Sequence, residues 1–123
     1  MHNEESILED IALLESKLKA VRRKGNLDVE SQICNRLGKL YELLGEWHEA
    51  FMFHHFDHEI AIALNDLEGQ LIALNNIGML YHRIGIFSKA EASFKAMLQV
   101  SDKAPKFSQH KCQVLLLVIT LQC

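Results

Sequence analysis

One pattern of apolar, glycine, tyrosine and alanine positions occurs twice in this chain at an offset of forty residues. The first copy is Leu37-Gly38-Lys39-Leu40-Tyr41 with Gly45 and Ala50, and the second is Ile77-Gly78-Met79-Leu80-Tyr81 with Gly85 and Ala90. A period of this size is typical of stacked helical hairpins, each of which buries its apolar side against a neighbour. The 123 residues include one proline and six glycines, which leaves long stretches free of helix breakers. The sequence therefore predicts an all-α fold.

Apolar spacing and turn residues set the expected boundaries. Ile7, Ile11, Leu14, Leu18 and Val21 follow a helical spacing that places them on one stripe. Turn-forming pairs stand at residues 25–26 and 65–66. We expect Gly45 and Gly85 to end helices in the left-handed conformation. The prediction is one domain over residues 1–123, with an N-terminal helix over 4–24, a first repeat over 27–64, a second over 67–101 and a degenerate or truncated third over 109–123.

Two of the glycines fall inside helices. A glycine in a helix interior costs about 1 kcal/mol relative to alanine, so Gly38 and Gly78 need a packing reason. The simplest reason is a partner helix that approaches too closely for a Cβ atom. For Gly38, we expect that partner to be the following helix, near Ala50.

The repeat degrades toward the C-terminus. The third glycine of the pattern would fall at Val118 and the third tyrosine at Leu121, after a predicted loop over 101–108 that contains Pro105. The apolar run from Val114 to Leu121 is shorter than the roughly 18 residues that span a bilayer, so no membrane segment is expected. The run is either a closing helix, a segment that docks on a missing repeat, or the end of a truncated chain. We favour the second or third interpretation, and the run could support self-association.

Charge and cysteine usage exclude several classes of protein. The net charge of −3 and a pI near 6.1 give no reason to expect direct nucleic-acid binding, which needs a clustered basic face. Three cysteines without a paired spacing do not indicate an oxidising compartment, and early acidic residues argue against a signal peptide. We therefore expect an intracellular protein. The basic residues at the end of the first helix complement the helix dipole; they are Lys17, Lys19, Arg22, Arg23 and Lys24.

The chain lacks the motifs of a catalytic or metal-binding protein. No phosphate-binding glycine loop, nucleophile motif or paired-carboxylate arrangement is present, so we predict no enzyme activity and no cofactor. His54 and His58 have the i, i+4 spacing that zinc sites use. They lack the accompanying glutamate and cysteines, and His54 occupies a repeat position that packs against a neighbour. We therefore interpret His54 as a packed histidine and predict no metal site.

The repeated positions resemble those of the tetratricopeptide (TPR) repeat, whose signature begins W-x2-L-G-x2-Y. With the mid-helix glycine as position 8, the matching positions are 4, 7, 8, 11, 20 and 24. In the first copy they are Cys34, Leu37, Gly38, Tyr41, Ala50 and His54, and in the second Leu74, Ile77, Gly78, Tyr81, Ala90 and Phe94. The resemblance implies a TPR-like α-solenoid of antiparallel hairpins that acts as a protein-interaction scaffold.

The forty-residue period resembles the TPR subclass of the Pins/LGN scaffolds and the Tonsoku-like proteins. Over about residues 10–98, three segments with His54 look like the N-terminus of Tonsoku-like proteins: Arg22-Arg23-Lys24-Gly25, Cys34-Asn35-Arg36-Leu37-Gly38 and Gly45-Glu46-Trp47-His48-Glu49-Ala50. That resemblance implies a nuclear scaffold in DNA replication, repair and chromatin maintenance. The Pins/LGN resemblance implies a cytoplasmic polarity and spindle-orientation adaptor. A regulatory or oligomerisation repeat of a larger enzyme is a further alternative.

The resemblance also implies a concave groove lined by positions 2, 5, 6, 9, 12 and 13 of each repeat. These residues are Gln32, Asn35, Arg36, Lys39, Glu42 and Leu43 in the first copy, and Ile72, Asn75, Asn76, Met79, His82 and Arg83 in the second. Amides and bases with few acids favour a protein or peptide ligand that carries acidic residues. The alternative is an ordinary solvated helix face. A chaperone-type carboxylate clamp is disfavoured, because it requires lysine and asparagine where this chain has Asn35 and Lys39.

Overall fold

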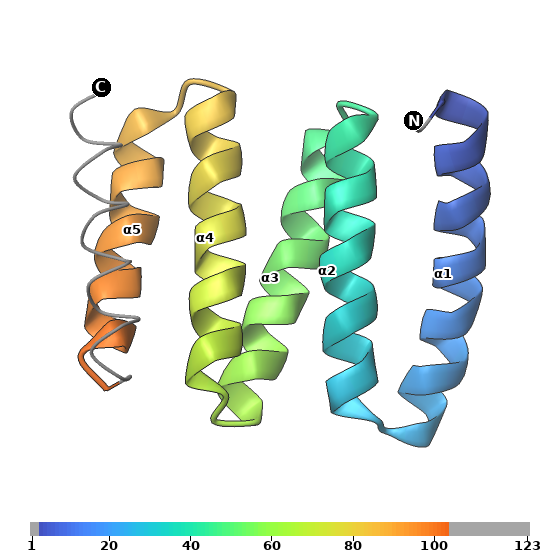
Figure 1. The fold of residues 1–123 in the computed structure, drawn as a ribbon, viewed down its shortest axis with the longest axis horizontal. Helices are drawn as coiled ribbons and strands as arrows, with labels where there is room; N and C mark the ends of the chain where they lie inside the picture. The colour runs from blue at the N-terminus through green and yellow to red at the C-terminus, as the bar shows by residue number, and fades with distance from the viewer. Residues whose placement is uncertain (1–2, 104–123) are drawn as a thin grey trace. The chain divides into compact units, whose positions relative to one another are not determined.

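The computed structural model describes residues 3–103, which form five α-helices and no β-strand (Figure 1). The helices are α1 (Glu4–Lys24), α2 (Leu27–Leu43), α3 (Trp47–Ala63), α4 (Leu67–Arg83) and α5 (Phe87–Ser101). The predicted all-α class is confirmed, and α2 and α3 each end one residue earlier than expected. Within the described residues, no helix is both long enough and apolar enough to cross a membrane.

The chain divides into two compact units, one up to Ile60 and one from Ala61 onward, with the division inside α3. Each unit is described by itself. Several predictions fall outside the described residues. They are the loop around Pro105, the third repeat over 109–123, and self-association through the run from Val114 to Leu121. The first residue of the expected loop, Ser101, is the last residue of α5 and is buried.

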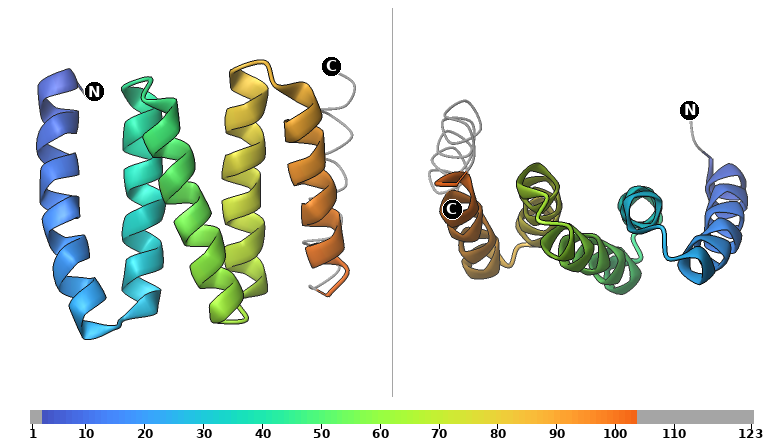
Figure 2. Two further views of the ribbon diagram at one scale, coloured as in Figure 1. Left: turned by 180° about the vertical axis from the view of Figure 1, so that it is seen from behind. Right: turned by 90° about the horizontal axis from the view of Figure 1, so that it is seen from below.

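In the first unit, α1 and α2 pack antiparallel, as Figure 2 shows. Four of the five α1 residues with the helical spacing are buried, as predicted, and Val21 is half-buried. The four buried residues pack with apolar side chains of α2 and the first part of α3. This core consists of Ile7, Ile11, Leu14, Leu18, Ile33, Cys34, Leu37, Leu40, Ala50 and Phe53. Tyr41 and Phe53 stack with their ring centroids 5.6 Å apart, which joins α2 to α3.

Local side-chain chemistry fixes the helix ends. The Asn3 side chain accepts a hydrogen bond from the Ser6 amide at 2.7 Å, and Asn26 and Asp66 cap α2 and α4 in the same way. Gly45 has a φ of 73° and Gly85 a φ of 86°, which is the left-handed conformation predicted for them. These caps explain why the helix boundaries follow from the sequence.

In the second unit, α4 and α5 form a hairpin around an apolar core. The buried residues of this core are Leu71, Leu74, Ala90, Phe94 and Met97. Lys95 and Glu91 form an exposed ion pair one turn apart on α5, at 3.0 Å. Such a pair contributes a few tenths of a kcal/mol, so the hairpin depends on its apolar core.

The two mid-helix glycines lie where a ring of the following helix meets the helix backbone. A Cβ built on Gly38 would lie 2.5 Å from Cε1 of His54, and one built on Gly78 would lie 2.7 Å from Cζ of Phe94. The predicted close approach to the following helix is confirmed. The contacting residue is His54, one turn beyond the expected Ala50, because the ring of His54 extends toward Gly38 and fills the space above it.

Candidate binding surfaces on α2 and α4

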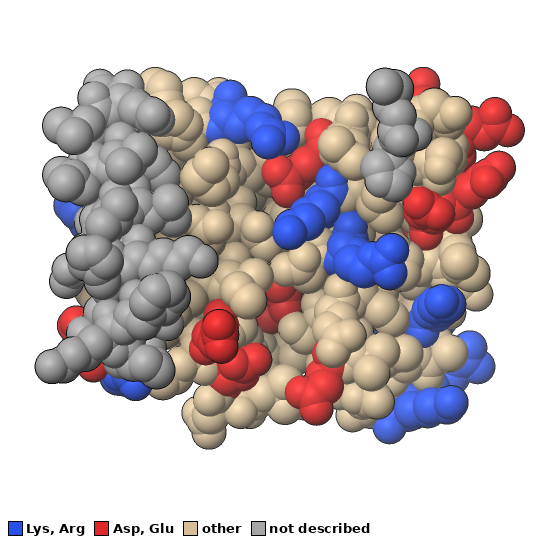
Figure 3. Space-filling view, viewed as in Figure 1, with Lys and Arg blue, Asp and Glu red and all other residues tan. Residues whose placement is uncertain are grey.

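An exposed stripe runs along α2. Gln32, Arg36, Lys39 and Leu43 follow a 4-3-4 spacing, which places them on one helical face, and all four are exposed. We call these residues the α2 stripe. Figure 3 shows Lys and Arg side chains gathered over the middle of α2. The α2 stripe can therefore offer two cations and an amide to a ligand that carries carboxylates.

The other two predicted groove residues of α2 contact α3. Asn35 donates a hydrogen bond from Nδ2 to Oδ2 of Asp57 at 3.4 Å. Nε2 of His54 lies 2.8 Å from Oε2 of Glu42 and donates to it. Asn35 and Glu42 therefore help to join α2 to α3, whereas the neighbouring residues of the α2 stripe remain exposed.

These contacts belong to a buried polar network. Asp57 also accepts a hydrogen bond from the Ser31 hydroxyl, and both Asp57 and His54 are almost completely buried. Nδ1 of His54 has no hydrogen-bond partner within the described residues. Sequence reasoning missed this network, although one signal was present. Forty residues beyond His54 and Asp57 stand Phe94 and Met97, and a polar residue at a position whose repeat counterpart is apolar indicates a buried partner.

A matching stripe runs along α4. Ile72, Asn76, Met79 and Arg83 have the same spacing as the α2 stripe, and we call them the α4 stripe. Its composition differs, because Ile72 is 47% exposed and Met79 is 45% exposed. The two stripes therefore offer different chemistry, with a polar and basic surface on α2 and a largely apolar one on α4.

Polar atoms without partners lie beside the apolar side chains of α4. Oδ1 of Asn75, Nδ2 of Asn76 and Nε2 of His82 are buried and have no hydrogen-bond partner within the described residues. The His82 ring packs edge-on against Phe87, with the centroids 5.2 Å apart. A buried polar group without a partner typically costs about 1–3 kcal/mol. The two asparagines therefore leave one buried acceptor and one buried donor without a hydrogen bond within the described residues.

The histidines of α3 occupy different environments. His54 is fully buried, which agrees with the interpretation as a packed residue, whereas His58 is half-buried. Burial lowers the pKa of both His55 and His58 from the usual value. No group of three or more His, Cys, Asp or Glu side chains in the part of the chain that the structure describes is arranged to hold a metal ion.

Burial also shifts the pKa values of two residues in the first unit. Burial raises the pKa of the Cys34 thiol to about 12, so this cysteine behaves as a small core residue. Burial, and then the hydrogen bond that the Tyr41 hydroxyl donates to Glu15 at 2.5 Å, raise the pKa of Tyr41 to about 12. Both groups are protonated at neutral pH, and neither lies on the α2 or α4 stripe.

A comparison with protein-family models finds no match for this chain, and no curated protein is significantly similar to it.

Proposed function

We propose that the chain is a non-catalytic, TPR-like protein-interaction module that binds an extended, acidic peptide segment. The observation that carries this proposal is the α2 stripe, in which Arg36 and Lys39 are exposed on one helical face and form no ion pair within the described residues of the first unit. In the second unit, Ile72 and Met79 of the α4 stripe are exposed and form a separate apolar surface.

The α2 stripe supports the acidic character of the ligand. Arg36 and Lys39 are exposed and form no ion pair within the described residues of the first unit, which leaves their charges available to carboxylates. The TPR-like interpretation is further supported by equivalent packing at the repeated glycines, where a ring at position 24 covers the glycine at position 8 in both hairpins. A repeated hairpin geometry with variable exposed stripes is the usual design of repeat scaffolds.

The cellular setting rests on sequence resemblance alone. Because the segments over about residues 10–98 resemble the N-terminus of Tonsoku-like proteins, we propose that the module belongs to a nuclear scaffold for chromatin and DNA repair. Recruitment of the full-length gene product to stalled replication forks would support this setting. Its absence there would refute the setting and leave peptide binding untouched.

The binding proposal is tested with two synthetic peptides of alternating apolar and charged residues, one with glutamate and one with lysine at the charged positions. The acidic peptide should bind and the basic one should not. Arg36→Glu with Lys39→Glu should weaken binding of the acidic peptide about tenfold or more, because two charge-assisted contacts become repulsive.

Lys17→Glu with Lys24→Glu makes the same change in net charge on α1 and should leave affinity unchanged. Equal affinity for the two peptides, or equal loss in the α1 control, would refute the assignment of the acidic site to α2.

A further inference from the structure

The outer face of α1 carries a regular series of exposed residues. Glu5, Glu9, Ala12, Ser16, Lys19 and Arg23 follow a 4-3-4-3-4 spacing and are all exposed. The buried stripe that begins at Ile7 lies on the other side of the helix and packs in the first unit. The exposed series, which we call the α1 outer face, is therefore not used in the packing of that unit.

The charges on this face separate along the helix. Acidic side chains lie over the N-terminal half of α1 and basic side chains over the C-terminal half, as Figure 3 shows. The arrangement is also symmetric about Leu14 in chain position. Glu5 and Arg23 stand at equal distances on either side of Leu14, as do Glu9 and Lys19. Reversing the helix direction therefore exchanges each of these acids with a base.

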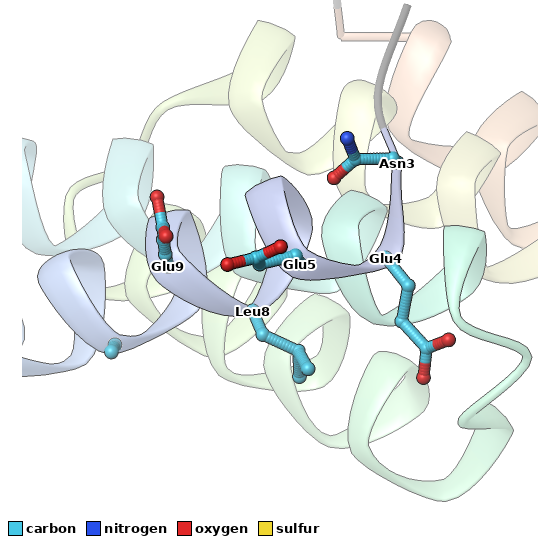
Figure 4. A pocket seen from close by; sticks show the side chains of 6 residues that line it. Asn3, Glu4, Glu5, Leu8 and Glu9 are labelled. Atoms are coloured by element: carbon cyan, nitrogen blue, oxygen red, sulfur yellow. The ribbon is translucent and has the colours of Figure 1, made fainter.

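A hollow on the acidic half fits the basic side chains of such a reversed helix. The hollow is lined by Leu8, Ala12 and the acidic side chains of Glu4, Glu5 and Glu9. Figure 4 shows Leu8 on the same turns of α1 as these acids. Lysine and arginine cover apolar surface with their methylene stems while their charged ends remain in water. An apolar strip bordered by carboxylates is the surface that such side chains complement.

We propose that the α1 outer face binds the same face of a second copy of this chain in an antiparallel, two-fold symmetric pair. Glu5 faces Arg23 of the second copy, and Glu9 faces Lys19 of the second copy. Two-fold symmetry makes each of these two contacts occur twice, so the pair contains four ion pairs.

Small side chains form the centre of this pair. Ala12 and Ser16 stand two positions on either side of Leu14, so Ala12 of one copy faces Ser16 of the other beside the symmetry axis. Neither side chain is long enough to hold the two helices apart. The acidic and basic side chains at the ends of the face can therefore reach their counterparts on the second copy.

The pair is a weak, salt-sensitive one. A 21-residue helix is about 31 Å long, and one helix-on-helix contact of that length is small for a stable dimer. Exposed ion pairs contribute little individually and are screened by salt. Association should therefore appear at high protein concentration and low ionic strength, and it should weaken as salt is added.

Sedimentation equilibrium of the full chain at low salt tests the proposal. The weight-average mass should rise with concentration from 14.1 kDa toward twice that value. Glu5→Lys with Glu9→Lys should weaken self-association about tenfold or more, and so should Lys19→Glu with Arg23→Glu, because four attractive contacts become repulsive.

Mixing the two charge-reversed variants supplies the decisive control. Their charges are complementary again, so an equimolar mixture should restore association to a heterodimer. Circular dichroism checks that each variant keeps its helical content, and Glu68→Lys on α4 serves as a charge reversal away from the face. A chain that stays monomeric at all concentrations would overturn the proposal. A dimer that neither reversal weakens, or variants that fail to associate on mixing, would overturn it as well.

Discussion

The contact between Gly78 and Phe94 predicts that Gly78→Ala either lowers or raises the stability of the fold, depending on the side chain at position 94. A Cβ on Gly78 would lie 2.7 Å from Cζ, 2.9 Å from Cε1 and 3.0 Å from Cε2 of Phe94. These three atoms form the tip of the phenyl ring, and Phe94 is 1% exposed, so the ring has little room to move. Leucine in place of Phe94 lacks all three of these atoms. In the double variant Gly78→Ala, Phe94→Leu, the added Cβ therefore takes space that the tip of the Phe94 ring occupied in the α4–α5 core.

Two effects of opposite sign determine the stability of Gly78→Ala. Overpacking a buried site costs about 1–3 kcal/mol, and we take about 2 kcal/mol because the new contacts are shorter than ordinary van der Waals distances. Alanine in a helix interior is favoured over glycine by about 1 kcal/mol. The expected net loss is therefore about 1 kcal/mol in the wild-type background. In the Phe94→Leu background the clash is absent, and the same substitution should stabilise the fold by about 1 kcal/mol.

Urea unfolding followed by circular dichroism measures both differences. The coupling between the two substitutions should be about 2 kcal/mol, which lies within the range found for residues in contact. In either background, the Gly78→Leu variant should be less stable than the Gly78→Ala variant, because leucine adds three further carbons. If Gly78→Ala has the same effect with phenylalanine and with leucine at position 94, the ring does not limit the space at Gly78 and the explanation is wrong.

Two further predictions concern Tyr41 and Cys34, whose pKa values are raised in the first unit. The raised pKa of Tyr41 means that the folded state favours the protonated phenol, so this contribution to stability is complete below pH 10 and is lost as the pH rises toward about 12. The free energy of unfolding measured across that range should fall, and Tyr41→Phe should reduce the fall; an unchanged fall would contradict the raised pKa of Tyr41. Cys34, with a pKa near 12, should react with a thiol reagent at pH 8 only as fast as the chain unfolds, tested in a Cys112→Ser, Cys123→Ser variant. Rapid reaction of the folded protein would show that Cys34 is accessible.

Helix boundaries could be predicted from the sequence because local chemistry determines them. Gly25 with Asn26, and Asn65 with Asp66, combine a left-handed residue with an N-cap, and both pairs separate helices as expected. The spacing of the apolar residues also identified the buried side of α1. These signals act within a few residues, so they require no knowledge of how helices are rotated against each other.

The surroundings of single side chains were harder to predict because they depend on that rotation. Asn35 and Glu42 stand at the edge of the face expected to line a groove, and a modest turn of α2 decides whether they meet a ligand or α3. In the structure they bond to Asp57 and His54. The residue that contacts Gly38 was predicted one turn too early, at Ala50 instead of His54, for a related reason. The spacing of the repeat does not show how far a buried ring extends.

The buried polar network of the first unit has a consequence for how a chain with duplicated hairpins folds. Similar helices from neighbouring repeats are prone to exchange partners during folding. If α3 paired with a helix that carries leucine where α2 has Ser31, the Asp57 carboxylate would be buried without that donor. His54 would likewise lose the acceptor that Glu42 provides. Pairing of α3 with α2 supplies both partners, so we expect the polar network to disfavour helix exchange between similar repeats.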